Sequence, residues 1–341
     1  MIETAVTFPG FLGDNRATIL NIERNLLPFL PKMICLSIRK IPETVLQKLE
    51  EIRFRAEKPV MLSTSGGQFF LGNNGQLLKF SNDALFISTQ DVHKTLEMMC
   101  EFSVYAFEED IKNGFLTLKG GHRVGISGRT VTENGGVKTI KDISSLNIRI
   151  SKEILGCAGK IIKYIIKDNK NIYNTLLISP PKCGKTTMLR DITRLLGDGD
   201  KELGFDSMKV SLIDERSEIA ACYKGVPQNH IGVSTDILDG CPKQEGMLMM
   251  LRSMSPQIII TDEIGSTGDY EAIQKIYNAG VSVVTSAHGY NISELKSRQE
   301  VLRLIEGNFF DRFIVLDNSK GPGTLKEIVD GSTMEVIYKC S

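Results

Sequence analysis

The stretch Ser179-Pro-Pro-Lys-Cys-Gly-Lys-Thr-Thr187 decides the fold of this chain. It follows an apolar run, Thr175 to Ile178, and precedes a helix-forming run, Met188 to Leu196. Three of its residues match the pattern G-x-x-x-x-G-K-[ST], namely Gly184, Lys185 and Thr186, while Ser179 replaces the first glycine. A strand before such a loop and a helix after it are the context in which the loop binds phosphates. The stretch therefore predicts a nucleotide-binding phosphate loop.

The residue types in the loop suit this chemistry. Successive backbone N–H groups from Lys182 to Thr186 can surround a β-phosphate, and Lys185 can reach the β and γ oxygens. The Thr186 hydroxyl can ligate Mg²⁺, whereas Cys183 is interpreted as a small filler rather than a nucleophile. The sequence thus predicts ATP and Mg²⁺ as cofactors, with a nucleotide-binding set of Ser179, Pro181, Lys182, Cys183, Gly184, Lys185, Thr186 and Thr187.

Two apolar runs after the loop end in an Asp-Glu pair, in Ser211-Leu-Ile-Asp-Glu-Arg216 and in Gln257-Ile-Ile-Ile-Thr-Asp-Glu263. In a phosphate-loop fold, an acid at the tip of a strand neighbouring the loop holds Mg²⁺ and a second carboxylate polarises the attacking water. Asp262 and Glu263 fit these two roles best, because the run before them is the more strongly apolar. The first pair, Asp214 and Glu215, forms a competing set with Glu218.

His288 ends a further apolar run, Val281 to Ser286, in the phrase Thr285-Ser-Ala-His-Gly289. We expect this run to be a strand that ends at the same edge of the sheet as the loop. A histidine at that edge could sense the γ-phosphate. It could equally form a hydrogen bond with the backbone, and the sequence leaves both interpretations open.

Length and composition favour two globular domains. The chain has 341 residues, which is more than one hydrophobic core usually serves, and its apolar content of 41% is ordinary. No apolar run approaches the roughly 18 residues that a membrane-spanning helix needs, and no secretory signal is readable. Seven cysteines without C-x-x-C spacing favour a reducing compartment over a disulfide framework or a zinc site. Lys plus Arg equals Asp plus Glu at 41 each, so bulk charge does not imply a polyanionic partner.

The first part of the chain reads as a small α+β domain over residues 35–150, preceded by a poorly defined segment, residues 1–34. We expect helices over Pro42–Arg55 and Asp91–Asp110, the second with Thr89 as a possible N-cap. Short strands are expected within Ser63–Phe80, and a β-hairpin within Gly114–Arg129 that turns at a glycine pair.

Residues 151–341 change to strands that alternate with helices. Such alternation of near-continuous apolar strands predicts a largely parallel sheet covered on both faces, with ligands at the carboxyl ends of its strands. Strands are expected at Thr175–Ser179, Val210–Asp214, Gln257–Asp262, Val281–Ser286, Arg312–Asp317 and Glu335–Tyr338. Helices are expected at Thr186–Leu196, Lys243–Met254, Tyr270–Asn278 and Ile292–Ile305.

With these residues in place, the chain resembles the stage III sporulation protein AA family, a branch of the secretion and type IV pilus ATPases within the RecA-like group. The phrases that carry the resemblance in the second domain are Pro180-Pro-Lys-Cys-Gly-Lys-Thr-Thr187, Ile213-Asp-Glu-Arg-Ser-Glu-Ile219, Asp239-Gly-Cys-Pro-Lys-Gln-Glu-Gly246, Arg252-Ser-Met-Ser-Pro256, Asp262-Glu-Ile-Gly265 and Ser286-Ala-His-Gly289. Those in the first domain are Glu51-Ile-Arg-Phe-Arg55, Gly120-Gly-His-Arg-Val-Gly-Ile-Ser-Gly-Arg129 and Ser144-Ser-Leu-Asn-Ile-Arg-Ile150.

The resemblance implies a RecA-like ATPase fold and adds roles for particular residues. It places the family's histidine box on His288, and it makes Arg123 and Arg129 similar to arginines that approach a nucleotide across a subunit boundary. Because Ile213–Glu218 resembles the acidic box of secretion ATPases, Glu218 or Glu215 competes with Glu263 as the group that activates water. Lys182 and Ser179 depart from the residues that the family's loop leads us to expect.

The resemblance also implies an assembly and a place in the cell. Such ATPases form rings, commonly hexamers, that dock on the cytoplasmic side of a membrane complex. The family implies a mother-cell ATPase that energises the channel between mother cell and forespore, with membrane-embedded channel proteins as partners and no direct nucleic-acid contact. Composition and spacing alone reach only as far as Mg-ATP hydrolysis in a two-domain protein.

Two other functions remain open from the sequence. A RecA-like protein that handles nucleic acid could use basic residues such as Lys160 and Lys163, although aromatic residues are sparse near them and the chain has no tryptophan. Alternatively, the chain could be a scaffold that binds nucleotide and hydrolyses it slowly. Retention of ATP without turnover would favour the scaffold, and stimulation by single-stranded DNA would favour nucleic-acid handling.

Overall fold

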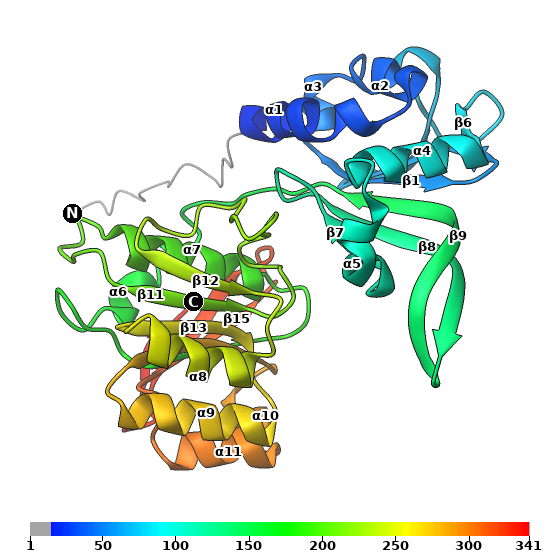
Figure 1. The fold of residues 1–341 in the computed structure, drawn as a ribbon. Coiled ribbons are helices and arrows are strands. Elements are labelled where there is room, and N and C mark those ends of the chain that lie inside the picture. Colours follow the sequence, from blue (N-terminus) through cyan, green and yellow to red (C-terminus); the bar gives the residue numbers. More distant parts are fainter. Residues whose placement is uncertain (1–14, 341) are drawn as a thin grey trace, which may run out of the picture. The chain divides into compact units, whose positions relative to one another are not determined.

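The computed structural model describes residues 15–340, which form two compact units that divide between Glu153 and Ile154 (Figure 1). Each unit has its own sheet and its own hydrophobic core.

Within residues 15–153, the main sheet has seven strands in the order β5-β4-β3-β1-β9-β8-β7, and neighbouring strands are antiparallel. The strands are β1 (Leu49–Arg55), β3 (Met61–Thr64), β4 (Gly67–Leu71), β5 (Leu77–Leu78), β7 (Phe115–Thr117), β8 (Arg123–Glu133) and β9 (Gly136–Arg149). A separate short pair joins β2 (Lys58–Pro59) and β6 (Phe86–Ile87). The expected hairpin is present as β7 and β8, and both glycines of the predicted turn, Gly120 and Gly121, have positive φ.

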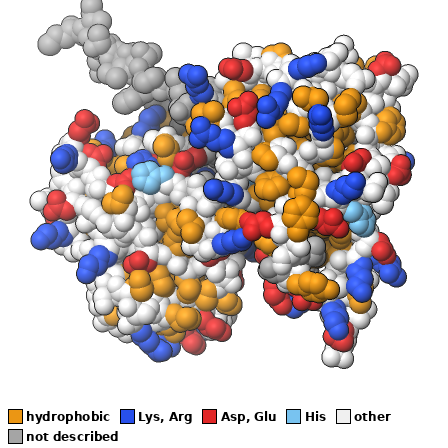
Figure 2. Space-filling model, turned by 45° about the horizontal axis from the view of Figure 1, so that its top comes forward, with side chains coloured by type: hydrophobic (Ala, Val, Ile, Leu, Met, Phe, Trp, Pro, Cys, Tyr) orange, Lys and Arg blue, Asp and Glu red, His pale blue; other side chains and the backbone are white. Residues whose placement is uncertain are grey.

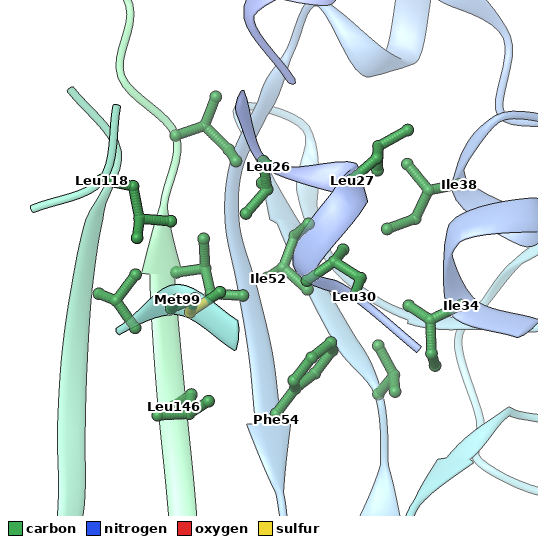
Figure 3. Packing of buried hydrophobic residues seen from close by; sticks show 14 of the residues in the cluster. Leu26, Leu27, Leu30, Ile34, Ile38, Ile52, Phe54, Met99, Leu118 and Leu146 are labelled. Atoms are coloured by element: carbon green, nitrogen blue, oxygen red, sulfur yellow. The ribbon is translucent and has the colours of Figure 1, made fainter. Parts of the chain in front are cut away.

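The helical segments of this unit are α1 (Asn15–Asn25), η1 (Leu27–Phe29), α2 (Lys32–Ile38), α3 (Glu43–Leu46), η2 (Asn73–Gly75), α4 (Thr89–Met99), η3 (Val104–Phe107) and α5 (Glu108–Lys112). The sequence predicts no regular element before residue 35, but residues 15–34 are largely helical. Pro28 lies in the first turn of η1 and Pro31 is the N-cap of α2, so both prolines occupy helix starts, where no N–H is needed. Leu26, Leu30 and Ile34 then belong to the same buried cluster as the sheet residue Ile52, and Figure 3 shows Leu26 and Leu30 beside Ile52.

Two predicted helices of this unit are corrected by the structure. Residues 49–55 form strand β1 instead of helix, with Ile52 and Phe54 buried on one face and both neighbouring strands paired to it. The helix expected to run to Asp110 ends at Met99, because Glu101 and Phe102 adopt left-handed φ values of 51° and 58°. Its N-cap is Ser88 rather than Thr89, in a reciprocal capping box with Asp91.

Over residues 154–340, the sheet has eight strands in the order β12-β11-β13-β14-β10-β15-β16-β17. The first six are parallel, and β16 and β17 continue antiparallel from β15. The strands are β10 (Thr175–Ser179), β11 (Val210–Asp214), β12 (Thr235–Asp239), β13 (Ile258–Glu263), β14 (Ser282–His288), β15 (Arg312–Asp317), β16 (Thr324–Asp330) and β17 (Val336–Lys339). The predicted, largely parallel sheet is confirmed, whereas β12 and β16 are not among the predicted strands.

Helices cover both faces of this sheet, as predicted (Figure 1). They are α6 (Ile162–Ile165), α7 (Lys185–Asp198), α8 (Lys243–Ser253), α9 (Thr267–Asn278), α10 (Ile292–Leu295) and α11 (Gln299–Glu306), so the single helix expected over Ile292–Ile305 is two. Successive residues of β10 serve opposite faces: Leu177 packs in the cluster of α7, and Ile178 in the cluster of α8, α9 and α11. The strands are buried on both faces for this reason.

The sheet order sets the distances in the site. Strands β10, β11, β13 and β14 all end at one edge, and Ser179 at the end of β10 lies in register with His288 at the end of β14. The strand that carries Asp262 and Glu263 is not the immediate neighbour of β10, because β14 lies between them. A side chain from β14 therefore stands between the loop strand and the acidic pair.

Candidate functional site

The phosphate loop connects β10 to α7 through two residues with left-handed backbone. Lys182 has a φ of 61°, and Gly184, the N-cap of α7, has a φ of 80°. Any side chain at position 184 would also be crowded, because an added Cβ would lie 3.0 Å from the backbone nitrogen of Gly323. That nitrogen donates a hydrogen bond to the carbonyl oxygen of Cys183 at 3.0 Å. The loop between β15 and β16 thus fastens onto the phosphate loop.

Lys185 is buried at the start of α7, with 9% of its surface exposed. Its Nζ donates to the carbonyl oxygen of Ser179 at 3.1 Å and contacts Nδ1 of His288. Burial lowers the pKa of Lys185, while the negative charge of Glu263 acts in the opposite direction. The ammonium is therefore held at the loop by a backbone oxygen and a ring nitrogen.

His288 joins Lys185 to Glu263. Its Nε2 lies 2.9 Å from Oε2 of Glu263. A neutral imidazole can accept from the lysine at Nδ1 and donate its Nε2–H to the carboxylate, so this tautomer satisfies both contacts. The histidine is placed between two side chains of the site, and these contacts are with side chains rather than with the backbone.

Asp262 contacts a lysine to which the sequence had assigned no role. Nζ of Lys243, the first residue of α8, lies 3.1 Å from Oδ1 of Asp262 and 3.2 Å from Oε2 of Glu215. Burial raises the pKa of Asp262, and Lys243 opposes that shift. Burial also acts to lower the pKa of Lys243, but Asp262 and Glu215 raise it overall. A cation at a helix N-terminus is unfavourable to the helix dipole, which makes Lys243 unusual at this position but does not reveal its contacts.

The competing acids at the end of β11 serve different contacts. Asp214 is fully buried and accepts hydrogen bonds from the backbone N–H groups of Glu218, Ile219 and Ala220, at 2.8 to 3.0 Å. Burial raises the pKa of Asp214 to about 6. Asp214 therefore organises the turn that follows β11, whereas the side chain of Glu218 is exposed.

A cavity of about 380 Å³ opens beside these acids, on the β11 side of the acidic pair. It is lined by Glu215, Arg216, Pro242, Lys243, Gln244, Glu263, Ile264, Gly265, Ser266 and Asp269. Within residues 15–340, no group of three or more His, Cys, Asp or Glu side chains could hold a metal ion on its own. A hydroxyl such as Thr186 and a carboxylate such as Asp262 nevertheless suit Mg²⁺, which usually takes one or two protein ligands together with substrate phosphates.

The two arginines named from the sequence both lie on β8, in the first unit. The guanidinium of Arg123 stacks 3.8 Å from the ring centroid of Phe115, and Arg123 faces Arg149 across the β8–β9 ladder. Arg129 lies farther along the hairpin, where its Nε pairs with Asp142 at 2.7 Å with both side chains exposed. Arg149 was not predicted, because only the strand register brings it opposite Arg123.

Charged side chains of both signs lie on the surface (Figure 2). On the face that Figure 2 shows, Lys and Arg side chains are interspersed with Asp and Glu side chains. In the part of the chain that the structure describes, no helix is both long and apolar enough to cross a membrane.

The sequence of this chain is similar to that of a known protein family. Residues 29–336 match the family described as "Sporulation stage III, protein AA". The chain is 43% identical over 301 residues to "Stage III sporulation protein AA" of Bacillus subtilis, covering 88% of this chain and 93% of that protein.

Two solved structures share the fold at low sequence identity. The ATPase DotB of Yersinia pseudotuberculosis has a TM-score of 0.51 at 14% identity, covering 84% of this chain and 76% of that one. The pilus retraction motor PilT, solved with bound ADP, has a TM-score of 0.51 at 15% identity, covering 78% and 74%. The RecA-like ATPase fold expected from the sequence is confirmed by these similarities.

Proposed function

The chain belongs to the sporulation stage III protein AA family, and on that premise we propose that it hydrolyses ATP with Mg²⁺ as the motor of a ring-forming, secretion-type ATPase. The observation that carries this proposal is the series of contacts Lys185–His288–Glu263 at the end of a phosphate loop. It joins a residue suited to the γ-phosphoryl group with one suited to activate water.

Each side chain has a distinct part in the proposed reaction. Backbone N–H groups from Lys182 to Thr186 hold the β-phosphate, and Lys185 leaves its contact with His288 to meet the γ-phosphate. Glu263 orients and polarises the attacking water. His288 connects the Glu263 carboxylate to Lys185, the residue that meets the γ-phosphate. Thr186 and Asp262 would hold Mg²⁺, which neutralises charge on the β and γ oxygens when it is bound.

The proposal extends to assembly and location. We propose that Arg123 and Arg129 approach the nucleotide of a neighbouring copy within a ring, which is commonly a hexamer in such ATPases. The ring would work in the cytoplasm of the mother cell, docked on membrane-embedded proteins of the channel that leads to the forespore. On the face that Figure 2 shows, basic and acidic side chains are interspersed, which supports a protein partner over a direct nucleic-acid partner for that face.

Replacing Lys185 with alanine tests the proposal. The lysine stabilises charge that develops in the transition state, so Lys185→Ala should lower the hydrolysis rate on the order of 10²- to 10³-fold. Phosphate release from ATP is measured with Mg²⁺ and with EDTA, and again with single-stranded DNA. Lys275→Ala, at an exposed position on α9, is the control and should keep the parent rate. Turnover of Lys185→Ala close to the parent rate would remove this loop from the reaction, and strong stimulation by DNA would favour nucleic-acid handling.

A further inference from the structure

Lys243 joins the ends of two neighbouring parallel strands. Its ammonium contacts the carboxylates of Glu215, which follows β11, and of Asp262, which lies on β13. It also donates to the main-chain carbonyl oxygen of Glu263. The side chain is 14% exposed, so these three oxygens replace most of the water around the charge.

The ladder between β13 and β14 is interrupted where the acidic pair lies. The two strands pair regularly from Ile258 to Ile260, and the register then shifts before Glu263. Side chains hold the carbonyl oxygens of the shifted stretch: the Thr285 hydroxyl donates to that of Asp262 at 2.6 Å, and Lys243 donates to that of Glu263. Lys243 therefore fixes the backbone of the residue whose carboxylate reaches His288.

The charges at this point need the lysine. Without it, Asp262 and Glu215 would face each other in a partly buried setting without the ammonium that contacts both, leaving Arg216 as a nearby positive charge, and like charges so placed repel. The lysine also forms an ion pair with Glu215. This contact holds the Glu215 carboxylate on the side of β13 that faces away from the phosphate loop. Glu263 is left as the carboxylate that faces the loop through His288.

We propose that Lys243 is a positioning residue that clamps the ends of β11 and β13, holding Glu215 away from the reacting phosphate and Glu263 toward it. This inference rests on the proposed function, because the reaction it supports is ATP hydrolysis. Lys243 does not touch the phosphate loop in these contacts, so it acts through the acidic residues.

Kinetics on the full chain test the positioning role. Lys243→Met should lower kcat on the order of 10²-fold through misplacement of Glu263, and should leave the KM for ATP within about threefold of the parent. Lys243→Arg keeps the charge and should recover part of the lost kcat. Lys275→Met, which replaces an exposed lysine on α9, controls for loss of a positive charge. A parent-like kcat for Lys243→Met would overturn the proposal. A rise in KM as large as the fall in kcat would overturn it as well.

Unfolding without nucleotide supplies a test that does not depend on hydrolysis. Urea midpoints are compared for Lys243→Met, Glu215→Gln and the double variant. If the lysine clamps the two acids, the double variant should lose less stability than the sum of the two single losses, because removing Glu215 relieves the repulsion. Strict additivity would contradict the clamp. If Lys185→Ala hydrolyses ATP like the parent while the midpoints remain coupled, the proposed function fails and the clamp stands as a structural contact only.

Discussion

At the scale of single residues, the polar side chains of the site are linked by direct contacts. Lys185 contacts His288, His288 contacts Glu263, and Lys243 contacts Asp262 and Glu215. In this arrangement Glu263 is engaged by the histidine. A bound γ-phosphate would compete with His288 for the ammonium of Lys185, and the resulting movement of the ring would change how Glu263 is held. Under the proposed function, arrival of substrate and readiness of the carboxylate would be coupled through one imidazole.

Isosteric replacement separates the candidate bases. Removing a water-activating carboxylate blocks chemistry but spares ground-state binding of Mg-ATP, so Glu263→Gln should bind nucleotide normally and hydrolyse it poorly. Binding is measured by fluorescence of a labelled nucleotide, and turnover by phosphate release. Glu215→Gln and Glu218→Gln are the matched comparisons. If Glu263→Gln turns over normally and either comparison variant is inactive, the base belongs to the β11 end.

The site residues whose positions could be predicted are those that the neighbouring sequence marks. Gly184, Lys185 and Thr186 are recognisable because the loop that they form is continuous in the chain. Asp262, Glu263 and His288 follow apolar runs, so their place at one sheet edge could be expected. Lys243 could not, because its contacts depend on which strands are neighbours.

At the scale of elements, the phosphate loop depends on a second loop, the one between β15 and β16. The backbone N–H of Gly323 donates a hydrogen bond to the carbonyl oxygen of Cys183, and Gly323 lies against Gly184. Anchoring of this kind keeps the backbone N–H groups at the start of α7 in place before a phosphate arrives, which reduces the ordering that binding requires.

Gly184→Ala tests this anchoring. Alanine at a φ of 80° costs about 1–2 kcal/mol from backbone strain alone, and here the Cβ would also press on Gly323. Gly280→Ala is a matched control, because Gly280 has a φ of 74° and no atom within 4 Å of an added Cβ. We expect both variants to lose stability in urea unfolding, but only Gly184→Ala to lose nucleotide affinity. Equal affinity in the two variants would show that the contact with Gly323 does not shape the loop.

The elements that were predicted wrongly have ambiguous patterns. Val45, Leu46, Leu49 and Ile52 keep helical spacing, yet Ile52 and Phe54 also alternate with Arg53 and Arg55 as in a strand. Pairing with β3 and β9 decides in favour of the strand, and those partners are distant in the sequence. The strands of the second unit were easier to predict because burial on both faces makes them continuous apolar runs.

At the scale of the whole molecule, the residues named in the proposed function divide between the two units. The phosphate loop and the acids lie within residues 154–340, whereas Arg123 and Arg129, which the proposal assigns to the nucleotide of a neighbouring copy, lie within residues 15–153. The fold class could be predicted because the alternation of strands and helices is local to each segment. The proposed assembly of copies would depend on surfaces that no periodicity in the sequence marks.

Arg123 and Arg129 lie in a unit that has no phosphate loop, so the proposed role for them in hydrolysis involves a neighbouring copy. An arginine supplied by a neighbouring copy can contribute about 10³- to 10⁵-fold in rate, because it meets charge that appears only in the transition state. If Arg123 acts in this way, Arg123→Ala and Lys185→Ala should each be inactive alone. A mixture should regain activity, since some interfaces would pair an intact loop with an intact arginine. Arg129→Ala, whose pair with Asp142 is exposed, is measured in the same way, because the proposal assigns Arg129 to the same nucleotide.

The measurement is phosphate release from mixtures at varied ratios, after exchange of subunits has been verified by the mass of differently tagged copies. Recovery should peak at intermediate ratios and vanish at both ends, because each pure protein lacks one half of every interface. If Arg123 only stacks on Phe115, its loss affects the stability of the hairpin or nothing. A mixture that exchanges subunits yet regains no turnover, or an Arg123→Ala protein with full activity, would exclude a site shared through this residue.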